Sequence, residues 1–199
     1  MTETALREDG RVALDNKSRR LNAKAFELIG EIITGCSEIE ARLGWLIAEV
    51  VAPQEPSRRN VFLLYGNDTM AVKLDRLRAA CEAGLPDDDG VPEPPIAHPL
   101  LVPRVLEHLA ELRTLQQMRN RLVHGEWVKK PDQPEVSRVG SITARGRLKS
   151  VVEDLDLHQL SAHRDFVLEV EDATFKLWVA AMFVRQGRNP DKPSERLPR

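Results

Sequence analysis

The chain has 199 residues, of which 42% are hydrophobic and 30% charged, and its formal net charge is −2. This composition is that of an ordinary globular protein able to bury a core, and the near-neutral charge excludes a generally basic nucleic-acid binder. The first twenty residues contain no hydrophobic run, and no apolar stretch reaches the length of a membrane span. We therefore expect one domain in a cytoplasmic protein, without a signal peptide and without membrane contact.

The first predicted element is a long helix over 21–51, preceded by a flexible arm over 1–20. Residues recur there at steps of three and four in a main row of Phe26, Ile29, Ile33, Cys36, Glu40, Leu43, Ile47 and Val50. A second row of Ile32, Ile39 and Leu46 widens the apolar stripe. Glu40 is the charged member of the main row, and an unpaired buried carboxylate is costly. Pairing with Arg119 would remove that cost, while a solvent gap in the stripe explains Glu40 equally well.

A shorter helix is predicted after Asn67, Asp68 and Thr69, which are three candidate N-caps. Its apolar row is Met70, Leu74, Leu77 and Cys81, and a proline-rich loop over 86–99 follows. Lys73 on this helix is expected to be a surface residue, although its reach toward a functional cleft stays open. Because Cys36 and Cys81 lie on apolar rows and lack metal-ligand spacing, we expect reduced core thiols and neither a metal site nor a cofactor.

A third helix is predicted over 100–123, and Gly125 ends it. Its core row is Val105, Leu109, Leu112, Leu115 and Leu122. Valines among glycines over 127–153 indicate two or three short strands, which we expect to form an inserted hairpin. A last helix starts near Asp156, and its row at steps of three and four is Leu160, His163, Val167, Val170, Thr174, Leu177, Ala181 and Val184. A disordered tail covers 187–199. The predicted fold is mainly all-α: a four-helix bundle over 21–186 with a β-hairpin insertion between helices three and four.

The segment that carries chemistry reads QQMRNRLVHGEW, at the end of the third predicted helix. Arg119 is followed by the polar Asn120, by three further residues and then by His124, with Gly125 and the aromatic Trp127 after it. This arrangement resembles the motif of HEPN domains, and the four-helix order is also similar. The specific part of the resemblance is this short stretch, whereas the architectural part covers most of the chain.

The resemblance implies a metal-independent endoribonuclease of the toxin or phage-defence type that acts as a homodimer, with Arg119 and His124 as catalytic residues. The 2′-hydroxyl of RNA would attack the adjacent phosphorus while the histidine moves a proton and the arginine holds the phosphoryl oxygens. On an ideal helix, positions five apart point about 140° from each other. Two motifs facing each other across a dimer would therefore serve one phosphate better than a single motif.

Supporting roles follow for Asn120, which would orient the phosphate, and for Glu40, which resembles an acidic residue that HEPN proteins often carry on the first helix. Between 119 and 149 the chain has eight basic and three acidic side chains, among them Arg121, Lys129 and Lys130 as candidate RNA contacts. A solvated, charged hairpin explains the same residues. His163 on the last helix is expected to be half exposed and without a catalytic role.

One departure limits the resemblance. Some HEPN toxins carry a tyrosine two places after the motif histidine that a partner antitoxin modifies, and Glu126 stands there in this chain. Pairing with such an antitoxin or another defence-system protein is therefore left open. Two further readings also remain: a non-catalytic HEPN-like module that binds RNA or a nucleotide, and a helical dimerisation protein that recruits another protein.

Overall fold

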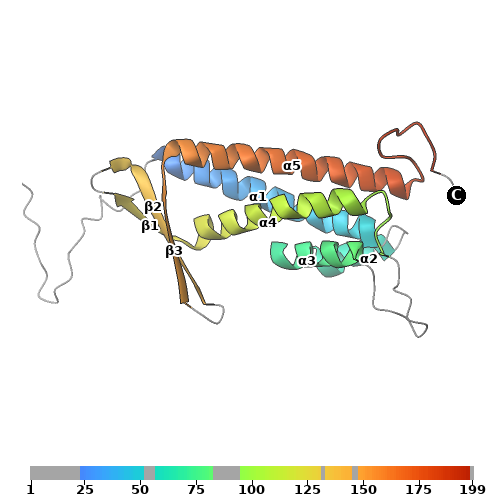
Figure 1. The fold of residues 1–199 in the computed structure, drawn as a ribbon, viewed down its shortest axis with the longest axis horizontal. Helices are drawn as coiled ribbons and strands as arrows, with labels where there is room; N and C mark the ends of the chain where they lie inside the picture. The colour runs from blue at the N-terminus through green and yellow to red at the C-terminus, as the bar shows by residue number, and fades with distance from the viewer. Residues whose placement is uncertain (1–22, 52–56, 83–94, 131–132, 145–147, 198–199) are drawn as a thin grey trace, which may run out of the picture. The chain divides into compact units, whose positions relative to one another are not determined.

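The computed structural model describes residues 23–51, 57–82, 95–130, 133–144 and 148–197, and the arm predicted over 1–20 lies outside them. The helices are α1 (Ala23–Val51), α2 (Ser57–Tyr65), α3 (Met70–Cys81), α4 (Val102–His124) and α5 (Leu157–Arg185). The strands are β1 (Glu126–Lys130), β2 (Gln133–Ala144) and β3 (Leu148–Leu155), which lie between α4 and α5 in the chain (Figure 1). The protein is mainly helical, as the sequence predicts.

The chain divides into two compact units. The first comprises Met1–Glu31 and Asn120–Arg164, and the second comprises Ile32–Arg119 and Asp165–Arg199. The sheet belongs to the first unit, whereas α2, α3 and most of α4 belong to the second. The helices α1, α4 and α5 each contribute residues to both units.

The second unit is built from helices that pack through apolar rows. In Figure 1, α1 and α5 run side by side, and Gly35 of α1 explains how closely they approach. A Cβ atom built on Gly35 would lie 2.5 Å from Cγ1 of Val167, so a larger residue there would collide with α5. The helices α3 and α4 are joined by an ion pair between Arg113 and Asp75, whose Nη2 and Oδ1 atoms are 2.7 Å apart.

The predicted apolar rows form most of the core. The α4 residues Val105, Leu109, Leu112, Leu115 and Leu122 are all buried, as are Leu160, Val167, Val170, Leu177 and Ala181 of α5. On α1 both predicted rows are largely buried: Ile32, Ile39 and Leu46 of the second row are fully buried, and so are Cys36, Leu43 and Ile47 of the main row. Phe26 of the main row is 56% exposed. The Glu40 side chain is 22% exposed.

The first unit contains an antiparallel sheet in the order β1-β2-β3. Glu126 of β1 pairs with Gly140 of β2, and the register shifts between Lys129 and Lys130. The α5 helix begins with a reciprocal cap, as Asp156 predicts. The N–H of Gln159 donates to Oδ1 of Asp156 at 2.7 Å, and the N–H of Asp156 donates to Oε1 of Gln159 at 2.9 Å.

The structure differs from the prediction in three elements. The helix α2 was not expected. Thr69 is the N-cap residue of α3, yet its side chain makes no capping hydrogen bond. The described residues of the predicted disordered tail form a turn, in which the N–H of Leu197 donates to the carbonyl of Gly187 at 2.8 Å. Gly187 enters this turn with φ +68°, a conformation that glycine adopts without strain.

The two cysteines are free and buried, as predicted. Within the described residues, no helix has a stretch long and apolar enough to span a membrane. The described residues also contain no group of three or more His, Cys, Asp and Glu side chains arranged to hold a metal ion.

Candidate functional site

The guanidinium of Arg119 lies beside the carboxylate of Glu40 in the second unit. Nη2 of Arg119 and Oε2 of Glu40 are 3.8 Å apart, and the two side chains are 27% and 22% exposed. The pairing considered from the sequence is therefore present. A separation of 3.8 Å is too long for a hydrogen bond, so the contact is an electrostatic pair between groups that do not bond directly.

The Arg119 guanidinium has unused hydrogen-bonding capacity. An arginine presents five N–H donors in a planar fork. Its Nε atom is buried and makes no hydrogen bond to any of the described residues. A buried donor without a partner costs free energy, and sites that keep such a donor often receive a ligand or a water molecule. This guanidinium is therefore positioned by Glu40 without being saturated by it.

Lys73 of α3 is the residue that the sequence placed wrongly. Its side chain is 2% exposed, and it is one of the largest fully buried side chains among the described residues. Its Nζ atom donates a hydrogen bond to the backbone carbonyl of Glu40 at 2.9 Å. Burial lowers the pKa of Lys73, while the charges of Glu40 and Asp68 oppose that shift. The acceptor lies on another helix 33 residues away, which a local pattern cannot reveal.

Cys36 adds an apolar neighbour to this cluster. It is fully buried on α1, one turn before Glu40. Burial raises the pKa of the Cys36 thiol to about 11, Arg119 lowers it and Glu40 raises it further. A thiol in this environment stays protonated at neutral pH, so it is a packing residue and a poor nucleophile.

The end of α4 belongs to the first unit and carries the other half of the motif. His124 is the last residue of α4 and is exposed, as is Asn120. The N–H of Gly125 donates to the carbonyl of Arg121 at 2.9 Å, which completes the last turn of the helix. The indole N–H of Trp127 donates to the carbonyl of Leu122 at 3.0 Å and so satisfies another carbonyl of that turn. Trp127 thus stabilises the helix end that presents His124.

Arg121, a candidate RNA contact, is engaged within the first unit. Its Nη1 atom lies 2.9 Å from Oε2 of Glu153 on β3. His163 is close to this pair: burial lowers its pKa, Glu153 opposes the shift and Arg121 adds to it. The two remaining candidates, Lys129 and Lys130, lie on β1, and their side chains are outside the described part of the chain.

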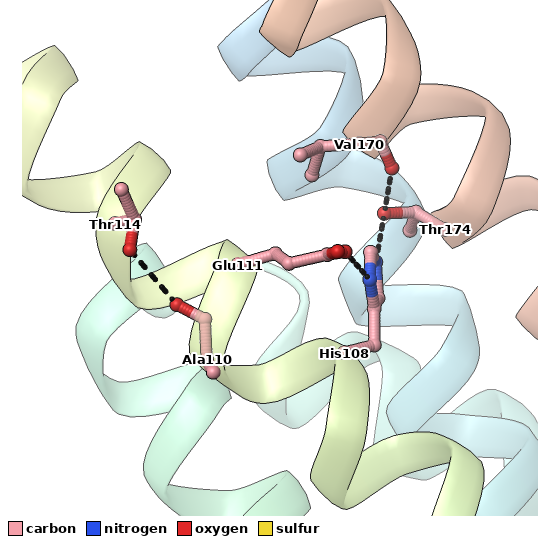
Figure 2. A network of polar contacts seen from close by, with 6 residues as sticks. All are labelled: His108, Ala110, Glu111, Thr114, Val170 and Thr174. Atoms are coloured by element: carbon pink, nitrogen blue, oxygen red, sulfur yellow. Dashed lines mark hydrogen bonds and ion pairs between the residues drawn. The ribbon is translucent and has the colours of Figure 1, made fainter.

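A pocket of about 280 Å³ lies between α4 and α5 in the second unit, and its lining includes His108 and Glu111 but not Arg119. Figure 2 shows the histidine ring held at both nitrogens: Nδ1 is 2.9 Å from Oε2 of Glu111, and Nε2 is 2.8 Å from Oγ1 of Thr174. A carboxylate, a histidine and a hydroxyl linked in this sequence resemble a catalytic triad. However, Thr174 is fully buried, and its hydroxyl donates to the carbonyl of Val170 at 2.7 Å. The arrangement is therefore a structural link between helices.

Comparisons of the chain with protein-family models, with curated proteins and with solved structures found no match. The geometry of the site therefore carries the functional argument. In the second unit the structure brings Arg119 and Glu40 together and adds Lys73 to them. In the first unit it exposes His124 at the end of α4 and pairs Arg121 with a carboxylate.

Proposed function

We propose that this protein is a metal-independent endoribonuclease in which Arg119 and His124 act on an RNA phosphate. The supporting observation is the state of Arg119: its buried Nε makes no hydrogen bond within the described part of the chain, and the Glu40 carboxylate is too distant to bond. A planar, permanently charged guanidinium fork suits the oxygens of a phosphoryl group, which it binds through two parallel hydrogen bonds.

The proposed chemistry needs the RNA and two side chains. The 2′-hydroxyl attacks the adjacent phosphorus, the bond to the 5′-oxygen breaks, and a 2′,3′-cyclic phosphate and a 5′-hydroxyl are released. His124 moves a proton either from the attacking hydroxyl or to the leaving oxygen. Arg119 stabilises the negative charge that builds on the phosphoryl oxygens. Asn120, exposed next to Arg119, orients the phosphate, and Glu40 holds the arginine.

A homodimer completes the proposed site. Residues five apart on a helix point in different directions, so two copies of α4 would supply Arg119 from one chain and His124 from the other. We place the protein in the cytoplasm, with a HEPN-like four-helix arrangement of α1, α3, α4 and α5 and with a toxin or phage-defence role. Lys129 and Lys130 remain proposed contacts for the RNA backbone.

The test is cleavage of a mixed RNA pool in EDTA by the wild type, by His124→Ala and by Arg119→Ala. His158→Ala is the matched control for the first variant, because His158 is another exposed histidine of the same unit. Arg113→Ala is the control for the second, because Arg113 is a partly exposed arginine on the same helix. We expect cyclic phosphate ends from the wild type and both controls, and none from the two motif variants. Full activity in His124→Ala would refute the mechanism.

Substrates that lack the attacking group separate catalysis from binding. An oligonucleotide with deoxyribose throughout should not be cleaved, because it has no 2′-hydroxyl. A wild type that binds RNA but cleaves none would support the non-catalytic HEPN-like module instead. Exposed Asn120 and His124 would then serve recognition, and both should weaken binding when replaced by alanine.

A further inference from the structure

The buried ammonium of Lys73 requires an explanation, because the core position it occupies is one that apolar residues fill. Met70, Leu74 and Leu77 share its face of α3, and all three are at most 2% exposed. Removing an ammonium from water costs several kcal/mol unless partners compensate. A methionine would fit the same space without that cost. Packing alone therefore does not explain why this position carries the ammonium of Lys73.

The contacts of Lys73 point to Glu40. Its Nζ atom donates to the carbonyl oxygen of Glu40 at 2.9 Å, and the charge of Glu40 acts on it. That carbonyl lies within α1, so the lysine fixes the helical turn that carries the Glu40 side chain. The same Glu40 carboxylate faces Arg119 at 3.8 Å. Glu40 thus contacts Lys73 of α3 through its backbone carbonyl and Arg119 of α4 through its carboxylate.

We infer that Lys73 is a positioning residue of the Arg119 site, which fixes the Glu40 turn and shares its negative charge so that Arg119 keeps donors free for a phosphate anion. This inference rests on the proposed function for the identity of the ligand. Lys73 and Arg119 face the carboxylate of Glu40, and Arg76 pairs with Asp68, the other carboxylate whose charge acts on Lys73. These three cations and two carboxylates leave a local charge of +1, which attracts an anion. Without Lys73, Glu40 balances Arg119 alone, moves onto the guanidinium and occupies the donors that a phosphate would use.

The experiment measures binding of a fluorescent single-stranded RNA whose 2′-hydroxyls are all methylated, so that it cannot be cleaved. The proteins are the wild type and Lys73→Met, with Lys73→Gln as a second neutral variant. Lys176→Met is the matched control, because Lys176 belongs to the same unit and is 72% exposed. We expect Lys73→Met to weaken binding roughly tenfold and the control to change it less than about twofold. Wild-type affinity in both Lys73 variants would overturn the inference.

A double-mutant cycle distinguishes positioning from a general structural effect. If Lys73 acts through Glu40, Lys73→Met should change the affinity less than about twofold when Glu40 is already glutamine. An equally large loss in the Glu40→Gln background would mean that Lys73 acts by another route. Thermal unfolding followed by circular dichroism shows whether each variant is folded at the temperature of the binding assay.

A second readout does not depend on RNA. The Nε–Hε resonance of Arg119, assigned by its disappearance in Arg119→Lys, reports whether a carboxylate has closed on the guanidinium. We expect slower hydrogen exchange at Hε in Lys73→Met, and the wild-type rate in Lys73→Met combined with Glu40→Gln. An unchanged rate in Lys73→Met contradicts the inference. A wild type that fails to bind or cleave RNA while these exchange rates follow the expectation refutes the proposed function alone.

Discussion

Glu40 and Arg119 face each other from α1 and α4 with 3.8 Å between Oε2 and Nη2, and both side chains are mostly buried. Neither group is matched by a direct hydrogen bond in this contact, since the distance is too long. Direct bonding would shorten the pair by about 1 Å and would use the arginine fork. The separation thus leaves Arg119 beside the carboxylate without a direct bond to it.

The first prediction concerns the stability that this pair contributes. Glu40→Gln removes the carboxylate that faces Arg119, and Lys73 loses one of the two carboxylate charges that act on it. We expect the free energy of unfolding in urea to fall by about 1 to 2 kcal/mol. Glu38→Gln is the control on the same helix. The Glu38 side chain is 54% exposed, and its Oε2 atom lies as far as 4.0 Å from Nη2 of Arg42, so this pair is weak. That variant should stay within about 0.5 kcal/mol of the wild type, and equal losses in the two would contradict the prediction.

The second prediction compares two threonines that make the same backbone contact. Thr174 donates to the carbonyl four residues earlier at 2.7 Å, and Thr114 does so at 3.1 Å (Figure 2). The Thr174 hydroxyl is also hydrogen-bonded to Nε2 of the buried His108, whereas Thr114 is exposed. Thr174→Val should therefore destabilise the protein by about 1 to 3 kcal/mol, because it leaves a buried ring nitrogen without a partner.

Thr114→Val should lie within about 0.5 kcal/mol of the wild type in the same urea titration. Replacing both His108 and Thr174, as His108→Leu with Thr174→Val, removes the two groups together. The double variant should be more stable than Thr174→Val alone, because no polar atom is left unpaired. If the double variant instead loses as much unfolding free energy as the two single variants added together, the hydrogen bond between His108 and Thr174 does not contribute to stability.

The sequence predicted the long helices because their apolar rows have a period that no other element shares. Leu109, Leu112 and Leu115 on α4 and Val167 and Val170 on α5 are buried as expected. The short helix α2 was missed for a physical reason. Its apolar residues Val61 to Leu64 are consecutive, and Leu63 and Leu64 are 63% and 68% exposed, so no helical period marks them. Phe62 of α2 instead stacks on Trp45 with ring centroids 3.8 Å apart, a contact formed only in the folded chain.

The candidate site was predicted in part for similar reasons. Arg119, Asn120 and His124 follow from one local motif, and the charge of Glu40 within an apolar row left pairing with Arg119 as one of two interpretations. Lys73 was expected at the surface because lysine is rarely buried without a partner. Its partner is a backbone carbonyl of α1, and every residue has such a carbonyl, so the sequence alone does not single it out.

The third prediction concerns a buried ion pair in the second unit. Nε of Arg185 lies 2.7 Å from Oε2 of Glu49, whose side chain is 2% exposed. Arg185→Met leaves a buried carboxylate without its arginine, and we expect a loss of about 3 kcal/mol in the free energy of unfolding. Combining it with Glu49→Leu should recover most of that loss, because both charges are then absent.

The control is the exposed ion pair between Lys176 and Asp172. Removing it through Lys176→Met should lower the free energy of unfolding by less than about 0.5 kcal/mol. A double variant no more stable than Arg185→Met would contradict this account.

The fourth prediction concerns pH. Burial lowers the pKa of His163 below its ordinary value of 6.5, with Glu153 opposing the shift and Arg121 adding to it. Between the lowered pKa and 6.5 the unfolded chain binds more protons than the folded one, so stability falls as the pH falls through this window. Above 6.5 the histidine is neutral in both states and the penalty is absent.

We expect the free energy of unfolding to drop more steeply below this pH in the wild type than in His163→Gln, as measured by urea titrations across the window. His158→Gln, which changes an exposed histidine of the same helix, should retain the wild-type slope. Equal slopes in the wild type and His163→Gln would show that His163 is not the titrating group.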